Sequence, residues 1–196
     1  KEADYNLLRK RFAGREIGFS GCTKDEQTCL ISVFSDTDPG EVFLFDRKTK
    51  ATAPQYKVRE KLPREALAAM EAIRYKSSDG MEIPAYLTIP KGAKRPLPLV
   101  VLPHGGPWAR DMWGYNGLAQ FLANRGYAVL QPNFRASTGF GKKFLNAGNG
   151  KWGETMQDDL TFGVKHLVAN GTVDPKRVGI LGGSYGGYAT LAGLAF

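Results

Sequence analysis

Cysteine and histidine are scarce in this sequence, which contains only two of each among its 196 residues. The cysteines, Cys22 and Cys29, form neither a Cys-x-x-Cys pair nor a cluster with histidine, so no metal site is predicted. No apolar run approaches the length of a membrane span, and we expect no membrane as partner. Repeats and low-complexity segments are absent too. The composition, 42% apolar and 23% charged, is that of an ordinary globular protein of one or two domains.

Positive charge is in excess, but no long run of basic residues carries it. The formal net charge is +8, and the excess lies in residues 72–196, where no run of basic residues is longer than two. Proteins that bind nucleic acids usually gather such charge on one helix or stripe. We therefore expect a dispersed, solvated surface charge and no nucleic acid as partner.

The two cysteines flank a short polar stretch that is predicted to be a hairpin loop. If Thr23 and Thr28 close this loop, Cys22 faces Cys29 across two strands, and a disulfide can form. A disulfide would favour a periplasmic or secreted protein over a cytoplasmic one. The alternative is a pair of small buried thiols in a cytosolic protein, and both interpretations remain open.

Residues 1–71 predict a short helix followed by three antiparallel strands. Tyr5, Leu8 and Phe12 have helical spacing within residues 2–13. Three short runs rich in Ile, Val and Phe are separated by turn residues, which indicates strands. The runs are 15–20, 28–35 and 41–46. They resemble one blade of a β-propeller, which cannot bury both of its faces alone. Pro63 is expected to open a helix that continues through Met70.

From residue 72 onward, apolar runs alternate with amphipathic segments. The segments 73–77 and 83–89 predict a hairpin around Asp79-Gly80. Further buried strands are predicted at 97–102, 127–130 and 178–181. Helices are predicted around Leu118–Leu122, with Leu118, Phe121 and Leu122 on one apolar face, and, after a glycine-rich loop, over 156–168. Buried strands that alternate with helices favour an α/β fold, with a mostly parallel sheet covered on both faces.

One short motif lies directly between a predicted strand and a predicted helix. In Gly182-x-Ser184-x-Gly186, the apolar run Val178–Leu181 precedes the glycines and a helical pattern follows them. This is the pattern of a nucleophile elbow, a sharp turn that lifts a serine hydroxyl above the sheet. The glycines are expected because strand and helix backbones approach closely there, and a Cβ would clash. The alternative is a glycine-rich turn whose serine has no catalytic role.

A second candidate loop follows the strand that is predicted to end at Leu102. A His-Gly-Gly loop at this position supplies one N–H of an oxyanion hole, and the residue after the nucleophile supplies the other. The predicted donors are therefore the backbone N–H groups of Gly106 and Tyr185, with His104 and Gly105 supporting the loop. We assign His104 no role in proton transfer, and we interpret His166 as a surface residue.

Several linked motifs together resemble the prolyl oligopeptidase family of serine peptidases, in its acylaminoacyl-peptidase and dipeptidyl-aminopeptidase-like branch. They are His104–Pro107, Asn133–Gly141, Trp152-Gly153 and Gly182–Tyr188. The resemblance implies that residues 1–71 are the last part of a β-propeller plus a linker helix. Residues 72–196 would then be the N-terminal part of an α/β-hydrolase catalytic domain. Two departures are His104, where relatives of prolyl oligopeptidase itself have a tyrosine, and Ala136, where glycine is expected.

The resemblance also implies a reaction, in which Ser184 forms an acyl-enzyme with an oligopeptide substrate, without metal or cofactor. In α/β-hydrolases the residues of the catalytic triad follow one another along the chain in the order Ser, Asp, His. None of the 12 residues after Ser184 is Asp or His. We therefore expect an internal fragment that is inactive alone and whose partner is the remainder of its own polypeptide. A homo-oligomer is a further expectation. The alternatives are a carboxylesterase on the same fold and a non-catalytic interaction module.

Overall fold

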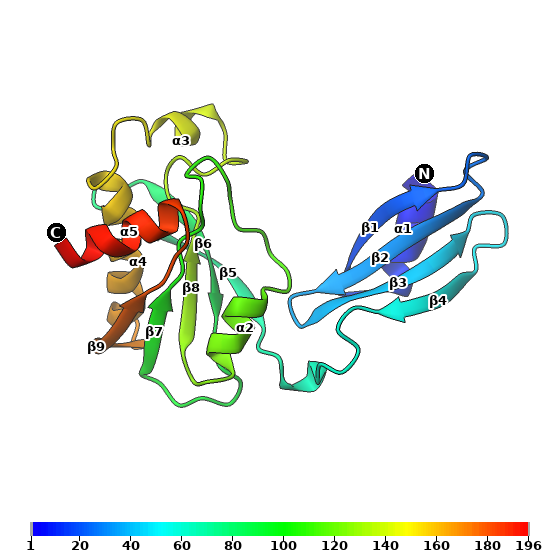
Figure 1. The fold of residues 1–196 in the computed structure, drawn as a ribbon, viewed down its shortest axis with the longest axis horizontal. Coiled ribbons are helices and arrows are strands. Elements are labelled where there is room, and N and C mark those ends of the chain that lie inside the picture. Colours follow the sequence, from blue (N-terminus) through cyan, green and yellow to red (C-terminus); the bar gives the residue numbers. More distant parts are fainter. Residues whose placement is uncertain (1, 196) are drawn as a thin grey trace. The chain divides into compact units, whose positions relative to one another are not determined.

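A computed structural model describes residues 2–195, and it divides the chain into two compact units, each built on its own β-sheet (Figure 1). The first unit runs to Leu67 and includes Gly114–Asn116. The second comprises Ala68–Trp113 and the residues from Gly117 onward. The assignment of 1–71 and 72–196 to two parts of larger domains stays a prediction.

The first unit consists of one helix and a four-stranded antiparallel sheet. Its elements are α1 (Glu2–Arg11), β1 (Glu16–Cys22), β2 (Thr28–Ser35), β3 (Asp38–Asp46) and β4 (Thr52–Lys57), and the strand order is β1-β2-β3-β4. The helix and the first three strands confirm the sequence prediction. Strand β4 was not predicted, because its side chains are nearly all exposed and show no apolar alternation.

The core of the first unit lies between α1 and one face of this sheet. Leu8 of α1 is fully buried, and it belongs to a cluster with Ile31 and Val33 of β2 and Phe43 and Phe45 of β3. Each strand contributes alternate residues to the cluster, as expected for a sheet with one covered face. Leu8, one of the residues with helical spacing in the helix predicted within residues 2–13, therefore lies in this core.

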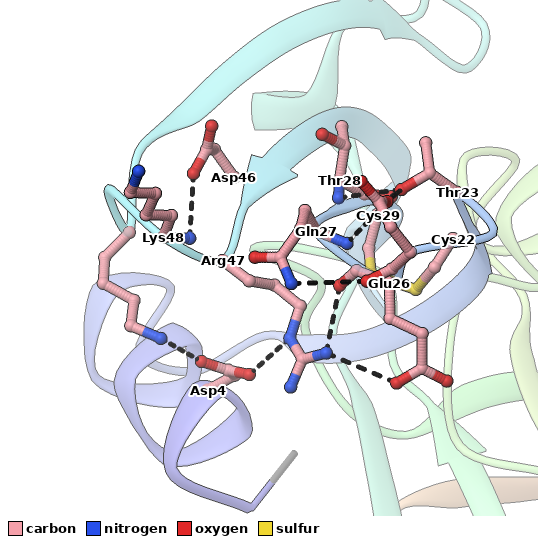
Figure 2. Close-up of polar contacts among 12 residues, drawn as sticks. Asp4, Cys22, Thr23, Glu26, Gln27, Thr28, Cys29, Asp46, Arg47 and Lys48 are labelled. Carbon is pink, nitrogen blue, oxygen red and sulfur yellow. Dashed lines mark hydrogen bonds and ion pairs between the residues drawn. A yellow bond between two sulfur atoms is a disulfide. The ribbon is translucent and has the colours of Figure 1, made fainter.

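The β1–β2 hairpin ends in a disulfide between Cys22 and Cys29, which is one of the two alternatives that the cysteine spacing left open (Figure 2). Cys22 pairs with Cys29 across the strands, and the N–H of Thr23 donates to the carbonyl of Thr28 at 2.9 Å. In the loop, the Thr23 hydroxyl donates to Asp25 Oδ1 at 2.6 Å. The predicted register of the two cysteines is therefore confirmed, whereas the compartment that it would indicate stays a prediction.

Two basic side chains in the turn between β3 and β4, Arg47 and Lys50, contact the carboxylate of Asp4 on α1 (Figure 2). Arg47 Nε donates to Asp4 Oδ2 at 2.8 Å, and Lys50 Nζ donates to Asp4 Oδ1 at 2.6 Å. The hydrogen bonds from Lys50 and Arg47 hold the pKa of Asp4 below its ordinary value. Arg47 also donates to the carbonyl of Glu26 at 3.0 Å, so one guanidinium joins the helix to the disulfide loop.

The second unit is a mixed α/β structure on a five-stranded sheet. Its strands are β5 (Met70–Lys76), β6 (Glu82–Thr88), β7 (Leu97–Val101), β8 (Ala128–Pro132) and β9 (Val173–Ile180), in the order β5-β6-β8-β7-β9. Only β6 runs against the others. The helices are α2 (Gly117–Ala123), α3 (Lys142–Asn146), α4 (Thr155–Ala169) and α5 (Tyr185–Ala195).

Helices cover both faces of this sheet, as the sequence predicts. Leu130 of β8 packs in one cluster with Leu160 of α4 and Ala189 of α5, whereas the neighbouring Val129 packs with Ala119 of α2. Adjacent residues of a strand point to opposite faces, so α2 lies on one side and α4 and α5 on the other. Within residues 2–195, no helix has the length and apolar character that crossing a membrane requires.

Four local predictions are wrong. The segment from Pro63 to Met70 is no helix: it holds only a 3-10 turn, η1 (Arg64–Ala66), and Met70 begins β5. Helix α2 exposes Leu118 and Phe121 and buries Gln120 instead. The run Val178–Leu181 is not a buried strand, because β9 lies at the sheet edge and Val178 is 39% exposed. Helix α3 lies where a loop was expected. Phe196, which was expected to belong to the helix after Ser184, lies outside the described residues.

Candidate active site

Ser184 occupies the turn between the edge strand β9 and helix α5. The strand ends at Ile180 and the helix begins at Tyr185, so only a few residues make the connection. Ser184 has a φ of 55°, in the left-handed region that residues other than glycine rarely adopt. Such strain persists only where the surrounding structure enforces it, and it is typical of the nucleophile elbow. The Ser184 side chain is exposed, as a nucleophile must be.

The two glycines that flank Ser184 are required by close backbone contacts. A Cβ at Gly182 would lie 2.5 Å from the carbonyl group of Gly186. A Cβ at Gly186 would overlap the carbonyl oxygen of Pro103, in the loop after β7. The steric reason inferred from the sequence is therefore confirmed at both positions. The same contact brings the start of α5 against the His-Gly-Gly loop.

The His104–Gly106 loop lies beside the candidate nucleophile. The Cβ position of Gly105 is 3.3 Å from Ser184 Cβ and 3.8 Å from Ser184 Oγ, so only a residue without a side chain fits easily there. The N–H of Leu181 donates to the carbonyl of Val101 at 2.9 Å, which extends the β7–β9 pairing to the elbow. The structure thus brings the two predicted site segments together.

The two predicted oxyanion donors are available to a ligand. Among residues 2–195, the backbone N–H groups of Gly106 and Tyr185 make no hydrogen bond. Tyr185 begins α5, where N–H groups have no intrahelical partner and the helix dipole is positive. Both N–H groups can therefore donate to a developing oxyanion, although this role stays a prediction.

The ring of His104 is engaged within its own surroundings. Nδ1 lies 2.7 Å from the carbonyl oxygen of Gly105, and Nε2 lies 2.8 Å from Ser137 Oγ. The ring stacks on Phe134, with centroids 4.4 Å apart, and burial lowers the pKa of His104. Because both ring nitrogens are engaged within the protein, His104 is suited to holding the loop rather than to proton transfer. His166 is exposed on α4, as predicted.

Aromatic side chains next to Ser184 were not predicted as part of the site. The ring of Tyr185 is 3% exposed, and its centroid lies 5.0 Å from Phe134, 4.9 Å from Trp152 and 5.7 Å from Tyr188. Burial raises the pKa of Tyr185, and its hydroxyl has no hydrogen-bond partner among the described residues. The spacing of Tyr185 and Tyr188, one turn apart at a helix start, was the available sequence signal.

The fold and the site define a class of protein. A mixed α/β sheet with a strained serine at a strand-to-helix turn, beside a glycine-rich loop with free N–H groups, is the arrangement of α/β serine hydrolases. Residues 113–196 match the sequence profile of the family described as "Prolyl oligopeptidase family". The chain belongs to the prolyl oligopeptidase family of serine peptidases.

Individual relatives agree with this assignment. Dipeptidyl aminopeptidase BIII from Pseudoxanthomonas mexicana is 44% identical over 92% of this chain and 27% of its own length. Dipeptidyl peptidase family member 6 from Caenorhabditis elegans is 37% identical over 88% of this chain and 26% of its own. A solved puromycin-hydrolyzing peptidase from Mycobacterium tuberculosis has a TM-score of 0.74 and 29% identity, over 85% of this chain and 27% of that one. The chain thus spans about a quarter of the curated relatives' length.

Proposed function

We propose that the whole protein is a serine peptidase that hydrolyses peptide bonds of oligopeptides, with Ser184 as its nucleophile. The observation that carries this proposal is the left-handed φ of 55° at Ser184, held between β9 and α5 beside the His104–Gly106 loop. The relatives named above are peptidases or aminopeptidases, which supports a peptide rather than an ester as substrate.

In the proposed reaction, Ser184 Oγ attacks the carbonyl carbon of the scissile peptide bond. The serine proton passes to a general base and then to the leaving amine, and water later releases the acid from the acyl-enzyme. The backbone N–H groups of Gly106 and Tyr185 donate to the carbonyl oxygen as it gains negative charge. No step requires a metal or a cofactor.

The general base and its orienting carboxylate are proposed to belong to a part of the whole protein that follows residue 196. In α/β-hydrolases the triad occurs in the chain order Ser, Asp or Glu, His. None of residues 185–196 is acidic or histidine, and the relatives are about four times longer than this chain. The 196 residues alone are therefore expected to be inactive, because an unassisted serine hydroxyl is a poor nucleophile.

The first unit is proposed to be one blade at the end of a β-propeller, and the second the N-terminal part of the catalytic domain. A propeller blade has four antiparallel strands, which is the number in the first unit. Helix α1 covers one face of this sheet, whereas the opposite face carries Leu30 (40% exposed), Leu44 (37%) and Tyr56 (62%). An apolar face of this kind suits a neighbouring blade.

The proposal is tested by changing Ser184 to Ala in the full-length protein. The substitution removes the nucleophile but little volume, so kcat should fall by on the order of 10⁶ while the unfolding midpoint barely moves. Ser78→Ala, at an exposed hairpin serine, is the matched control and should leave kcat unchanged.

The measurements are turnover of dipeptidyl and acylaminoacyl amides and of p-nitrophenyl esters, together with fluorophosphonate labelling and mapping of the labelled residue. Labelling at a residue other than Ser184 would refute the nucleophile. Turnover of esters alone would identify a carboxylesterase, and no labelling of the wild-type protein would indicate a non-catalytic module.

A further inference from the structure

Arg135 is a buried cation in the loop after β8, and it plays no part in the proposed reaction steps. It is 3% exposed. Its guanidinium binds two carboxylates: Nε and Nη2 donate to Asp159 at 2.9 and 2.8 Å, and Nη1 and Nη2 donate to Asp79 at 2.8 and 3.0 Å. Arginine offers this planar, two-sided fork, which lysine lacks.

The two carboxylates belong to different elements of the second unit. Asp79 lies in the turn of the β5–β6 hairpin, where its side chain is 44% exposed. Asp159 lies on α4, is fully buried, and also accepts from the Arg135 backbone N–H at 2.9 Å and from the Ser77 hydroxyl at 2.6 Å. Burial raises the pKa of Asp159, and the hydrogen bonds from Arg135 and Ser77 oppose this rise. Arg135 thus fixes its loop to a hairpin and a helix at once.

The residues on either side of Arg135 contact both halves of the candidate oxyanion hole. Phe134, fully buried, stacks on His104 and lies against the ring of Tyr185 at 5.0 Å between centroids. Ser137, also fully buried, lies 2.8 Å from His104 Nε2. One donor N–H belongs to Tyr185, and the other belongs to Gly106 in the loop that His104 holds.

We propose that Arg135 is a positioning residue for the oxyanion hole, acting through Phe134 and Ser137 on the backbone N–H groups of Tyr185 and Gly106. This inference rests on the proposed function. Such donors must sit within a fraction of an ångström of the developing oxyanion, and small displacements are costly in rate. A loop held by a single weak contact would let Phe134 and Ser137 shift together. The guanidinium hydrogen bonds of Arg135 to both Asp159 and Asp79 prevent that shift.

The test uses the full-length protein with Arg135→Lys, which keeps the positive charge but loses the fork. The matched control is Arg74→Lys, at another arginine paired with a carboxylate, Glu82 at 2.7 Å, where both side chains are exposed. Active sites are titrated with a fluorophosphonate, and kcat per titrated site, KM and the unfolding midpoint are measured. Arg135→Lys should lower kcat per site about tenfold to a hundredfold with KM within about twofold, because the lost stabilisation belongs to the transition state. Arg74→Lys should change neither.

A purely structural role gives a different result. Arg135→Lys would then lower the unfolding midpoint and the number of titratable sites, but kcat per titrated site would be unchanged, and that outcome overturns the inference. Asp79→Asn provides a second variant that leaves no buried charge unpaired, since Arg135 keeps Asp159. It should lower kcat per site in the same direction but less. An unchanged value there also overturns the inference, even if Arg135→Lys does not fold.

Failure of the proposed function is recognised separately, because wild-type protein and Ser184→Ala are assayed alongside. A wild-type protein without Ser184-dependent turnover contradicts the function itself. A wild-type protein with normal turnover, next to an Arg135→Lys variant of equal kcat, contradicts only the role of Arg135.

Discussion

Ala136 occupies a backbone conformation that usually requires glycine, with a φ of 79°. The residue is 1% exposed, and its methyl group faces Gly148 so closely that a Cβ there would overlap the Ala136 Cβ. The absence of a side chain at 148 therefore makes room for the methyl at 136. The family resemblance indicated glycine at 136, and the structure shows where the additional methyl group is accommodated.

This pair predicts a specific coupling between two substitutions. Gly148→Ala should lower the free energy of unfolding by about 1–3 kcal/mol, because overpacking forces the loop to shift. Ala136→Gly removes the opposing methyl, so the double variant Ala136→Gly/Gly148→Ala should be more stable than the sum of the two single effects predicts. Urea denaturation of the four proteins measures this coupling. Additive effects of the two substitutions would contradict the contact.

Residues that act locally could be predicted from the sequence, and residues that act at a distance could not. Gly182 and Gly186 were found because a nucleophile elbow places its steric demands two positions before and after the serine. The pairing of Arg135 with Asp159 spans 24 positions and follows no local period, so no pattern could indicate it. The same holds for the contact between Ala136 and Gly148.

At the scale of elements, the approach of α5 to the loop after β7 depends on Gly186. Gly186→Ala should lower the free energy of unfolding by about 1–3 kcal/mol, because the new Cβ meets the Pro103 carbonyl, which is backbone and cannot rotate away. Gly183→Ala is the matched control: nothing lies within 4 Å of a Cβ there, so its effect should stay within about 0.5 kcal/mol. Thermal unfolding of both variants distinguishes them. Equal stability would show that α5 can move away from the loop.

Elements whose apolar residues recur with a clear period were predicted well. Features that depend on contacts between distant parts of the sequence were not. The strands 73–77, 83–89 and 97–102 correspond to β5, β6 and β7 because continuous or alternating apolar runs specify them. In α2, Gln120 is buried because its side-chain amide pairs with Ala68, accepting from the N–H at 2.9 Å and donating to the carbonyl at 2.7 Å. The hydrogen-bonded backbone lies 52 positions away in the sequence, so no helical period reveals the contact.

At the scale of the whole molecule, the α/β fold class followed from alternating strands and helices, and the sheet of the second unit ends in an exposed edge strand. Strand β9 pairs with β7 on one side only. Val178 and Leu181 are 39% and 43% exposed, and Leu191 and Leu194 on α5 are 68% and 81% exposed. An unpaired strand edge with apolar side chains is a template for pairing with another chain.

The 196-residue chain is therefore expected to self-associate through β9 at micromolar concentration. Multi-angle light scattering should give a mass above the 21.5 kDa of one chain, rising with concentration. Val178→Lys should shift the distribution toward the monomer, because a charged residue on an edge strand disfavours pairing. Leu118→Lys is the matched control, at a residue of similar exposure (44%) on α2, and it should leave the distribution unchanged. A wild-type chain that stays monomeric, or an equal effect of both substitutions, would contradict association through this edge.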